Sequence, residues 1–465
     1  MSLQTPDKIL TLQRKMYRKA KAEPAFRFYV LYDKICREDI LHHAYRLARS
    51  NAGSPGVDGV TFARIEAAGA QEWLAGLREE LASKTYRPQS VRRVMLPKPG
   101  GGERPLGIPT IRDRVVQTAA KLVLEPIFEA DFEDSAYGYR PNRGGGQAVK
   151  EVHRLLCRGH TDVVDANLSG YFDSIPHADL MRSVARRVVD RHVLHLIKMW
   201  LKAPVEERDS DGKRCMSGGQ KATRGTRQGG VASPLLANIY MNRFLKHWRQ
   251  TARDEKFRAH IISYADDFVI LSRGCADEAL AWTRAVMTKL GLTLNEVKTS
   301  VKNAREDHFD FLGYTFGPQH YRKDGHWYLG ACPSRKSVQR LKTKVSDLLL
   351  PGEMERWPDV RDRLNSLLRG WSSYFDYGTR LQAYRAVDNY VYDRVRHFLA
   401  RRHNEPGRGT RRFSRDYVYG ESGVMLVIGR RIGREARRVG QAVEVDRRQD
   451  EQQRAGHHQQ HDRED

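Results

Sequence analysis

The sequence predicts an α+β fold, in which strands and helices alternate over the first two-thirds of the chain and helices follow. Residues 261–270 form an apolar, β-branched run that Asp266 and Asp267 interrupt, which predicts a buried hairpin with the two carboxylates near its turn. Residues 333–405 instead carry apolar residues at helical spacing. This change of period predicts a mixed domain followed by a helical one.

The carboxylate pair of the hairpin is the first candidate site. Two carboxylates between apolar strands are unstable unless cations neutralise them. Mg²⁺ is commonly bound by one or two carboxylates together with substrate phosphates. Two such ions, about 3.5–4 Å apart, suit phosphoryl transfer because they contact both the attacking and the leaving oxygen. Asp266 and Asp267 are therefore predicted metal ligands, since the alternative of a solvated turn does not require apolar strands on both sides.

The charge of the chain indicates a polyphosphate partner. The 465 residues include 81 Lys and Arg against 57 Asp and Glu, which gives a net charge of +24. Such an excess favours nucleic acid, where the release of counterions supplies affinity. A membrane surface is less favoured, because no long basic helix with an aromatic apolar face stands out. No window approaches 18 apolar residues, so no membrane span is expected.

Cysteine usage and the first residues predict a cytoplasmic protein. The five cysteines are scattered and never paired as Cys-x-x-Cys, which is typical of a reducing compartment and argues against a zinc site. The chain begins without an apolar signal region, so no secretory signal is expected.

The elements before residue 131 follow from spacing and turn residues. Helices are expected at residues 1–50, 71–83 and 111–130. Glycine and proline mark a turn at 51–59. Residues 91–109 predict two short strands joined by a glycine turn, with Lys98 and Arg104 beside it. Such a hairpin suits closing over a triphosphate, and a hairpin charged only for solubility is the equal alternative.

Three later segments are candidates for contact with nucleic acid. Residues 137–143 form an aromatic and basic loop suited to stacking and backbone contact, with a packed turn as the alternative. Residues 162–175 form a strand that runs into a turn and a helix, and alternation along the strand places Asp165 and Asn167 on the same side. Residues 223–238 form a glycine-rich loop that opens a helix, so its backbone can approach a base pair closely.

These blocks, in this order, resemble a bacterial group II intron reverse transcriptase/maturase. The matching segments lie at residues 54–59, 98–104, 139–141, 169–173, 227–231, 264–267, 294–299, 309–314 and 369–375. The resemblance implies a right-hand polymerase fold: fingers and palm, with an antiparallel sheet carrying Tyr-Ala-Asp-Asp at 264–267, and then an α-helical thumb or maturase (X) domain. It covers roughly residues 10–425.

The resemblance also implies the domain boundaries. The expected parts are an N-terminal extension with the first fingers segment at 1–85, the fingers and palm at 86–332, the thumb and maturase domain at 333–425, and a tail at 426–465. The tail is polar and carries few large apolar groups, so we expect it to be disordered.

Roles for individual residues follow from the same resemblance. Asp266 and Asp267 would hold two Mg²⁺ ions, which Mn²⁺ could replace. The nucleotide-binding residues would be Lys98 and Arg104 for the triphosphate, Phe172 as a gate against the ribose 2′-hydroxyl, Gln228 for the nascent base pair, and Lys298 near the phosphates. The primer grip would be Leu312, Gly313 and Tyr314.

The basic helices after residue 333 are predicted to bind RNA. Their apolar stripes, which should form a core, are Val338, Leu341, Val345 and Leu348, and then Leu381, Tyr384, Val387, Val391, Val395 and Phe398. Their polar sides carry Arg340, Lys342, Lys344, Arg385, Arg394 and Arg401. The family holds its intron with this region, where shape and phosphate contacts would dominate. A solvated charged face is the alternative.

The partners implied are group II intron RNA, an RNA template with a DNA primer, dNTPs and target DNA. Family members that cut target DNA carry an HNH nuclease with paired cysteines, which this sequence does not contain. We therefore expect the primer to come from another source, such as a replication fork.

One residue departs from the family pattern. The first catalytic Asp is expected where this chain has Asn167, and an amide brings no charge to a metal site. Loss of one such ligand should lower the rate on the order of 10³-fold or more. Asp165 lies on the same side but about 6–7 Å along the strand, which makes it a poor substitute.

Three explanations of Asn167 remain open. The first is a laboratory substitution that traps an inactive complex. The second is natural decay of polymerase activity in a copy that is kept for help with splicing or that is drifting. The third is residual activity through the backbone carbonyl of Leu168 and the remaining aspartates. We predict weak or absent polymerisation. The other functions considered are a catalytically silent RNA-binding splicing cofactor and a reverse transcriptase recruited to host defence or repair.

Overall fold

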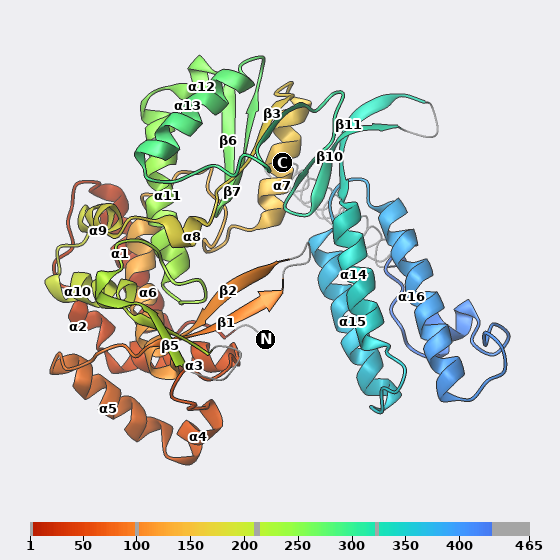
Figure 1. Cartoon of the computed structure of the whole chain (residues 1–465), viewed down its shortest axis with the longest axis horizontal. Helices are drawn as coiled ribbons and strands as arrows, with labels where there is room; N and C mark the ends of the chain where they lie inside the picture. Colours follow the sequence, from red (N-terminus) through yellow and green to blue (C-terminus); the bar gives the residue numbers. More distant parts are fainter. Residues whose placement is uncertain (1–2, 98–101, 209–213, 321–324, 430–465) are drawn as a thin grey trace, which may run out of the picture. The chain divides into compact units, whose positions relative to one another are not determined.

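The computed structural model describes residues 3–97, 102–208, 214–320 and 325–429. It divides into two compact units, Met1–Phe309 and Asp310–Asp465, called here the first and the second unit (Figure 1). The α+β fold class is confirmed, since helices occur with sheets whose strand pairs are antiparallel apart from the parallel pair of β1 and β4. In the described ranges, no helix combines the length and the apolar character needed to cross a membrane.

The first unit begins with helices that surround α6. Their bounds are α1 Asp7–Ala22, α2 Tyr32–Ile35, α3 Glu38–Ser50, α4 Phe62–Ala67, α5 Ala70–Ala82 and α6 Ile111–Glu129. The helices predicted at 71–83 and 111–130 are confirmed by α5 and α6. Because α6 is apolar on most sides, it is buried along most of its length and packs against α1, α3 and α11 (Ser233–Gln250).

The sheet that carries the carboxylates has the strand order β6-β7-β3-β8 and is antiparallel throughout. Its strands are β3 Asp162–Asn167, β6 Ala259–Tyr264, β7 Asp267–Ser272 and β8 Ser300–Asn303. Helices α7 (Gly145–Cys157) and α13 (Ala276–Lys289) pack on it (Figure 1). The strand, turn and helix predicted over residues 162–175 are confirmed by β3 and the short helix α8 (Tyr171–Ser174), and the predicted hairpin is confirmed by β6 and β7.

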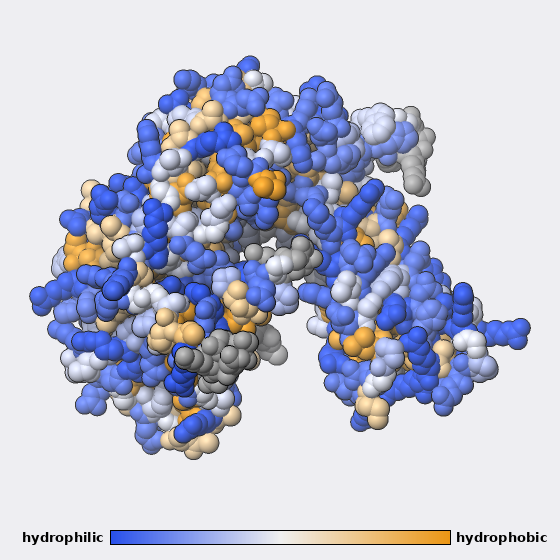
Figure 2. All heavy atoms as spheres, viewed as in Figure 1, coloured by the Kyte–Doolittle hydropathy of each residue, from blue (hydrophilic) through white to orange (hydrophobic). Residues whose placement is uncertain are grey.

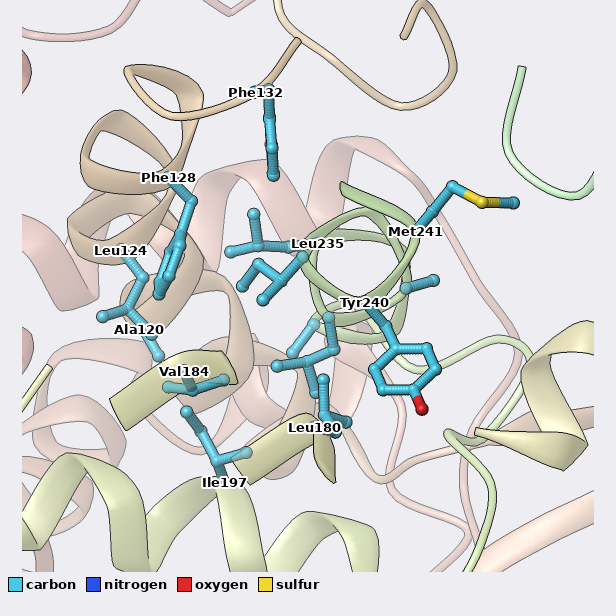
Figure 3. Packing of buried hydrophobic residues seen from close by; sticks show 14 of the residues in the cluster. Ala120, Leu124, Phe128, Phe132, Leu180, Val184, Ile197, Leu235, Tyr240 and Met241 are labelled. Carbon is cyan, nitrogen blue, oxygen red and sulfur yellow. The ribbon is translucent and has the colours of Figure 1, made fainter. Parts of the chain in front are cut away.

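One hydrophobic core fills the first unit, from Ile9 in α1 to Leu294 after α13. Figure 3 shows part of it, where Leu124 and Phe128 of α6 lie toward Leu235 of α11. Helices α9 (His177–Ala185) and α10 (Arg191–Leu201) close it from another side. The residues of the predicted N-terminal extension therefore share one core with the predicted palm.

A second sheet of the first unit has the order β2-β1-β4-β5. Its strands are β1 Val91–Pro97, β2 Glu103–Ile108, β4 Pro204–Arg208 and β5 Arg214–Gly218. The two predicted strands are confirmed as an antiparallel pair, while β4 and β5 were not predicted. The remaining short helices are α8 Tyr171–Ser174, η1 Gly219–Lys221 and α12 Arg253–Lys256.

The second unit joins a three-stranded sheet to a helical bundle. The elements are β9 Phe309–Phe311, β10 Tyr314–His320, β11 Trp327–Pro333, α14 Arg335–Leu348, α15 Trp357–Tyr374, α16 Leu381–Arg402 and η2 Tyr417–Glu421. Both predicted apolar stripes supply the core: Leu341, Val345, Tyr384, Val387, Val391, Val395 and Phe398 are buried. Val338, Leu348 and Leu381 are half-buried at its edge.

The division between the units differs from the boundary predicted at 332/333. The Tyr314 ring of β10 lies 5.0 Å from the Phe375 ring, and Ser337 Oγ of α14 donates a hydrogen bond to Gly313 O at 2.9 Å. The sheet therefore groups with the helices that follow it. Most of the predicted polar tail, residues 430–465, lies outside the described residues.

Candidate active site

The turn between β6 and β7 carries the two predicted carboxylates. Ala265, with a φ of 59°, lies in the left-handed region and closes the turn. The flanking strands are buried as predicted, but Asp266 is half-buried and Asp267 is exposed. The expectation of a buried carboxylate pair is therefore corrected, because the turn lies at the end of the sheet, where the carboxylates reach solvent.

Asn167 lies directly beside Asp267, as cross-strand partners of β3 and β7. Its Nδ2 donates a hydrogen bond to the Asp267 carboxylate. Its backbone oxygen accepts from Asn295 N at 2.8 Å, and the next residue, Leu168, donates its N–H to Asp266 O at 3.3 Å. The residues predicted as metal ligands thus meet at one end of one sheet, and Asp165 pairs with Val269 further along β3.

The electrostatics of Asp267 indicate a site that would gain from a bound cation. Desolvation by the surrounding protein raises the pKa of Asp267, and the nearby Asp266 charge raises it further. The hydrogen bond from Asn167 and the charge of Lys298 oppose this rise in the pKa. A divalent cation would relieve the repulsion between the two carboxylates in the same way.

The donor set fits a divalent cation, although it lacks a third carboxylate. Two carboxylates and nearby backbone and amide oxygens are the hard ligands that Mg²⁺ prefers. Within the part of the chain that the structure describes, no cluster of three or more His, Cys, Asp or Glu is arranged to hold a metal ion.

The hairpin of β1 and β2 contacts the glycine-rich loop at 223–238. Arg104 Nε donates to Gln228 Oε1 at 3.1 Å, and Gly107 N donates to Gln228 O at 2.6 Å. A β-carbon on Gly229, whose φ is 98°, would collide with the Gly107 carbonyl oxygen. Two residues predicted from separate motifs, Arg104 and Gln228, are thus brought together, whereas Lys98 lies outside the described residues.

The aromatic and basic loop at 137–143 divides into a buried and an exposed part. Arg140 is buried, and its guanidinium forms an ion pair with Glu129, with Nη2 2.7 Å from Oε1. For Arg140, the structure therefore agrees with the packed-turn alternative given for this loop. Tyr139 is exposed, and its ring lies 6.3 Å from that of Phe172, which is buried.

Lys298 reaches the site through a turn that begins beside β3. Lys298 N donates to Asn295 O at 3.0 Å, and Asn295 is itself bonded to Asn167. Sequence reasoning missed Asn238, whose Nδ2 donates to Gly138 O at 2.7 Å from a buried position on α11. An asparagine on an apolar helix could have marked it, but nothing in the sequence identifies its partner.

In the second unit, the predicted primer-grip residues form a tight turn before β10. Leu312 and Gly313 have φ values of 50° and 81°. The Tyr314 side chain is fully buried and its hydroxyl donates to Tyr374 O at 2.9 Å, while Tyr374 donates its own hydroxyl to Leu312 O at 2.8 Å. Any contact with a primer is therefore left to the half-buried Leu312 and Gly313.

The predicted RNA-binding cations of the second unit fall into two groups. Those that are exposed are Arg340, Lys344, Arg385 and Arg401. Lys342 is half-buried, with its Nζ 5.2 Å from the centre of the Tyr390 ring, and Arg394 is half-buried, with Nη2 donating to Leu349 O at 3.5 Å. Figure 2 shows that the visible face of this unit is mostly hydrophilic.

Comparison with known proteins places these features in a family. Residues 96–316 match the family "Reverse transcriptase (RNA-dependent DNA polymerase)", and residues 338–418 match "Group II intron, maturase-specific domain". Protein YkfC of Escherichia coli (strain K12) is 35% identical over 343 residues, which cover 66% of this chain and 87% of YkfC.

The group II intron-encoded protein LtrA of Lactococcus lactis subsp. cremoris is also 35% identical, over 213 residues. That match covers 46% of this chain and 34% of LtrA. Among solved structures, telomerase from Candida albicans aligns over 70% of this chain and 65% of its own, with 13% identity and a TM-score of 0.39. Both family matches and the similarity to YkfC agree with the carboxylate hairpin and with the contact between Arg104 and Gln228. The chain belongs to the group II intron reverse transcriptase/maturase family.

Proposed function

We propose that this chain is a reverse transcriptase and maturase that copies RNA into DNA and binds intron RNA to assist splicing and mobility. The observation that carries the proposal is the meeting of Asp266, Asp267 and Asn167 at one sheet end, in a unit where Arg104 contacts Gln228. The maturase-specific match in the second unit adds the RNA-binding half of the proposal.

The family uses divalent metal ions, and we propose Mg²⁺ as the ion held by Asp266 and Asp267. When bound, it would activate the primer 3′-hydroxyl and neutralise charge on the departing pyrophosphate. Arg104 would bind the triphosphate of a dNTP, and its bond to the Gln228 side chain fixes where its guanidinium lies. Gln228 would in turn present its backbone beneath the new base pair.

Asn167 weakens the polymerase half of this proposal. Its amide brings no charge, and its Nδ2 already donates to the carboxylate that should bind the ion. We propose that polymerisation by this chain is impaired. The alternative of a catalytically silent RNA-binding cofactor is favoured by this one hydrogen bond. The substrates we propose are an RNA template, a DNA primer, dNTPs and target DNA, with group II intron RNA as the structural partner.

The RNA-binding half is tested by removing the four exposed cations of α14 and α16. We expect the quadruple change of Arg340, Lys344, Arg385 and Arg401 to Gln to weaken intron RNA binding. The slope of log affinity against log salt should fall by about 3. Filter binding between about 50 and 200 mM salt measures both quantities.

A matched control removes four exposed cations from the first unit. The control residues are Arg64, Lys256, Lys289 and Arg305. If both quadruple variants lose affinity for intron RNA to the same extent, the second unit is not its principal binding surface. The maturase proposal would also fail if the unaltered chain bound unrelated structured RNA as tightly as group II intron RNA.

A further inference from the structure

An exposed tyrosine stands beside the proposed metal ligands. Tyr139 is 45% exposed, whereas Phe172, the predicted sugar gate, is 7% exposed. The two rings are 6.3 Å apart and nearly perpendicular, and the Tyr139 ring lies 6.5 Å from that of Tyr264. Of these two neighbouring rings, that of Tyr139 is therefore the more accessible from solvent.

The backbone around Tyr139 is held in a conformation that a bulky residue rarely adopts. Its φ is 55°, a strained conformation for a non-glycine residue that persists only where the surroundings impose it. The surroundings do so here. Asn238 holds the Gly138 carbonyl, Tyr137 N donates to Ser263 O at 2.8 Å, and a β-carbon on Gly138 would strike the backbone of Ala265. These contacts therefore hold the backbone from which the Tyr139 ring projects in one conformation.

Charged groups of both signs influence the Tyr139 hydroxyl. Burial raises the pKa of the Tyr139 hydroxyl, and the negative charges of Asp266 and Asp267 raise it as well, while Arg104 lowers it. The hydroxyl is thus within range of the proposed metal ligands and of the proposed triphosphate ligand. The sugar of a dNTP held between those two groups would lie against this ring.

We propose that Tyr139 is a specificity-determining residue, whose ring positions Phe172 and completes the wall that meets the sugar of an incoming deoxynucleotide. The inference rests on the proposed polymerase function. The Phe172 ring is flanked by the Tyr171 ring, 5.8 Å away, and by the more exposed Tyr139 ring, 6.3 Å away. Without the Tyr139 ring, Phe172 can move outward or aside and leave room for a ribose 2′-hydroxyl.

The test uses nucleotide binding without chemistry, so that Asn167 does not limit it. The primer ends in a dideoxynucleotide on an RNA template, and the next complementary dNTP or rNTP is added with Mg²⁺. The dissociation constant of each nucleotide is measured from retention of the primer and template after a heparin challenge. We expect Tyr139→Ala to lower the ratio of rNTP to dNTP dissociation constants about tenfold, and Tyr139→Phe to keep it.

Two further variants make the outcome decisive. Tyr137→Ala is the control, since its ring lies in the same loop against Arg143, 5.5 Å from the guanidinium, and the ratio should not change. Tyr139→Asn removes the ring while tolerating the left-handed backbone, in case the Ala variant does not fold. The inference is overturned if removal of the Tyr139 ring leaves the ratio of rNTP to dNTP dissociation constants unchanged. Equal weakening of the binding of both nucleotides counts as such a result. If the unaltered chain retains primer and template no better with any nucleotide, the proposed function fails as well.

Discussion

Replacing Asn167 with Asp is expected to raise the rate of primer extension on an RNA template by about 10³-fold. The introduced carboxylate would add the missing negative charge beside Asp267. It would also remove the Asn167 amide group, which now donates a hydrogen bond to the Asp267 carboxylate. Single-turnover extension with Mg²⁺ and dNTPs, compared between the unaltered chain and Asn167→Asp, measures the difference. The gain should appear mainly in the rate of the chemical step, because the change adds a ligand that matters most in the transition state.

Two controls separate this result from a general effect on folding. Asn167→Asp combined with Asp267→Asn restores the number of carboxylates but not their arrangement, and it should remain inactive. Asp165→Asn in the unaltered chain should have no effect. Comparable extension by the unaltered chain and the Asn167→Asp variant would show that another carboxylate completes the site, and loss of that activity in Asp165→Asn would identify which one.

Replacing Arg140 with Met is expected to destabilise the first unit by about 3–5 kcal/mol, the usual cost of leaving one partner of a buried ion pair alone. The Arg140 side chain is only 3% exposed, and its Nη1 also donates to Glu133 O at 2.6 Å and Ala136 O at 2.8 Å. The substitution therefore leaves the Glu129 carboxylate and two carbonyls without their donor. Urea denaturation followed by circular dichroism measures the change in the free energy of unfolding.

The same loop supplies the comparison. Arg143 pairs with Asp134 at 2.7 Å, but the Asp134 side chain is 96% exposed, so Arg143→Met should cost no more than about 1 kcal/mol. The double change Arg140→Met with Glu129→Leu should recover part of the lost stability, because no buried charge is then left alone. Equal losses in the two single variants would contradict the assignment of Arg140 as a buried structural residue.

Periodicity alone was enough to predict the elements that hold the site. The β-branched run at 261–270 became β6 and β7, and the stripe of α6 became part of the core, because both patterns reflect burial that is local in sequence. The solvent accessibility of Asp266 and Asp267 was misjudged. The apolar pattern of the two strands does not show that the turn between them lies at the end of the sheet, where it reaches solvent. The roles proposed for the nucleotide-binding residues remain predictions.

Residues that depend on distant partners could not be predicted in the same way. The sequence shows the charge of Arg140 in an aromatic and basic loop, which suggests contact with nucleic acid. It does not show that its ion-pair partner is Glu129, at the end of helix α6. Asn238 was missed for a similar reason, because its acceptor is a backbone carbonyl 100 residues earlier. Strands β4 and β5 were missed because short strands with many polar residues carry little hydrophobic pattern.

The continuous core of the first unit limits how the chain can be shortened for expression. Helices α1 and α3 pack directly on α6, so a fragment that starts at the predicted fingers boundary, residue 86, would leave the apolar sides of α6 facing water. Such a fragment would tend to aggregate even though it contains every proposed catalytic residue. A minimal polymerase fragment therefore has to begin before Asp7, and a search for shorter active versions should remove residues from elsewhere.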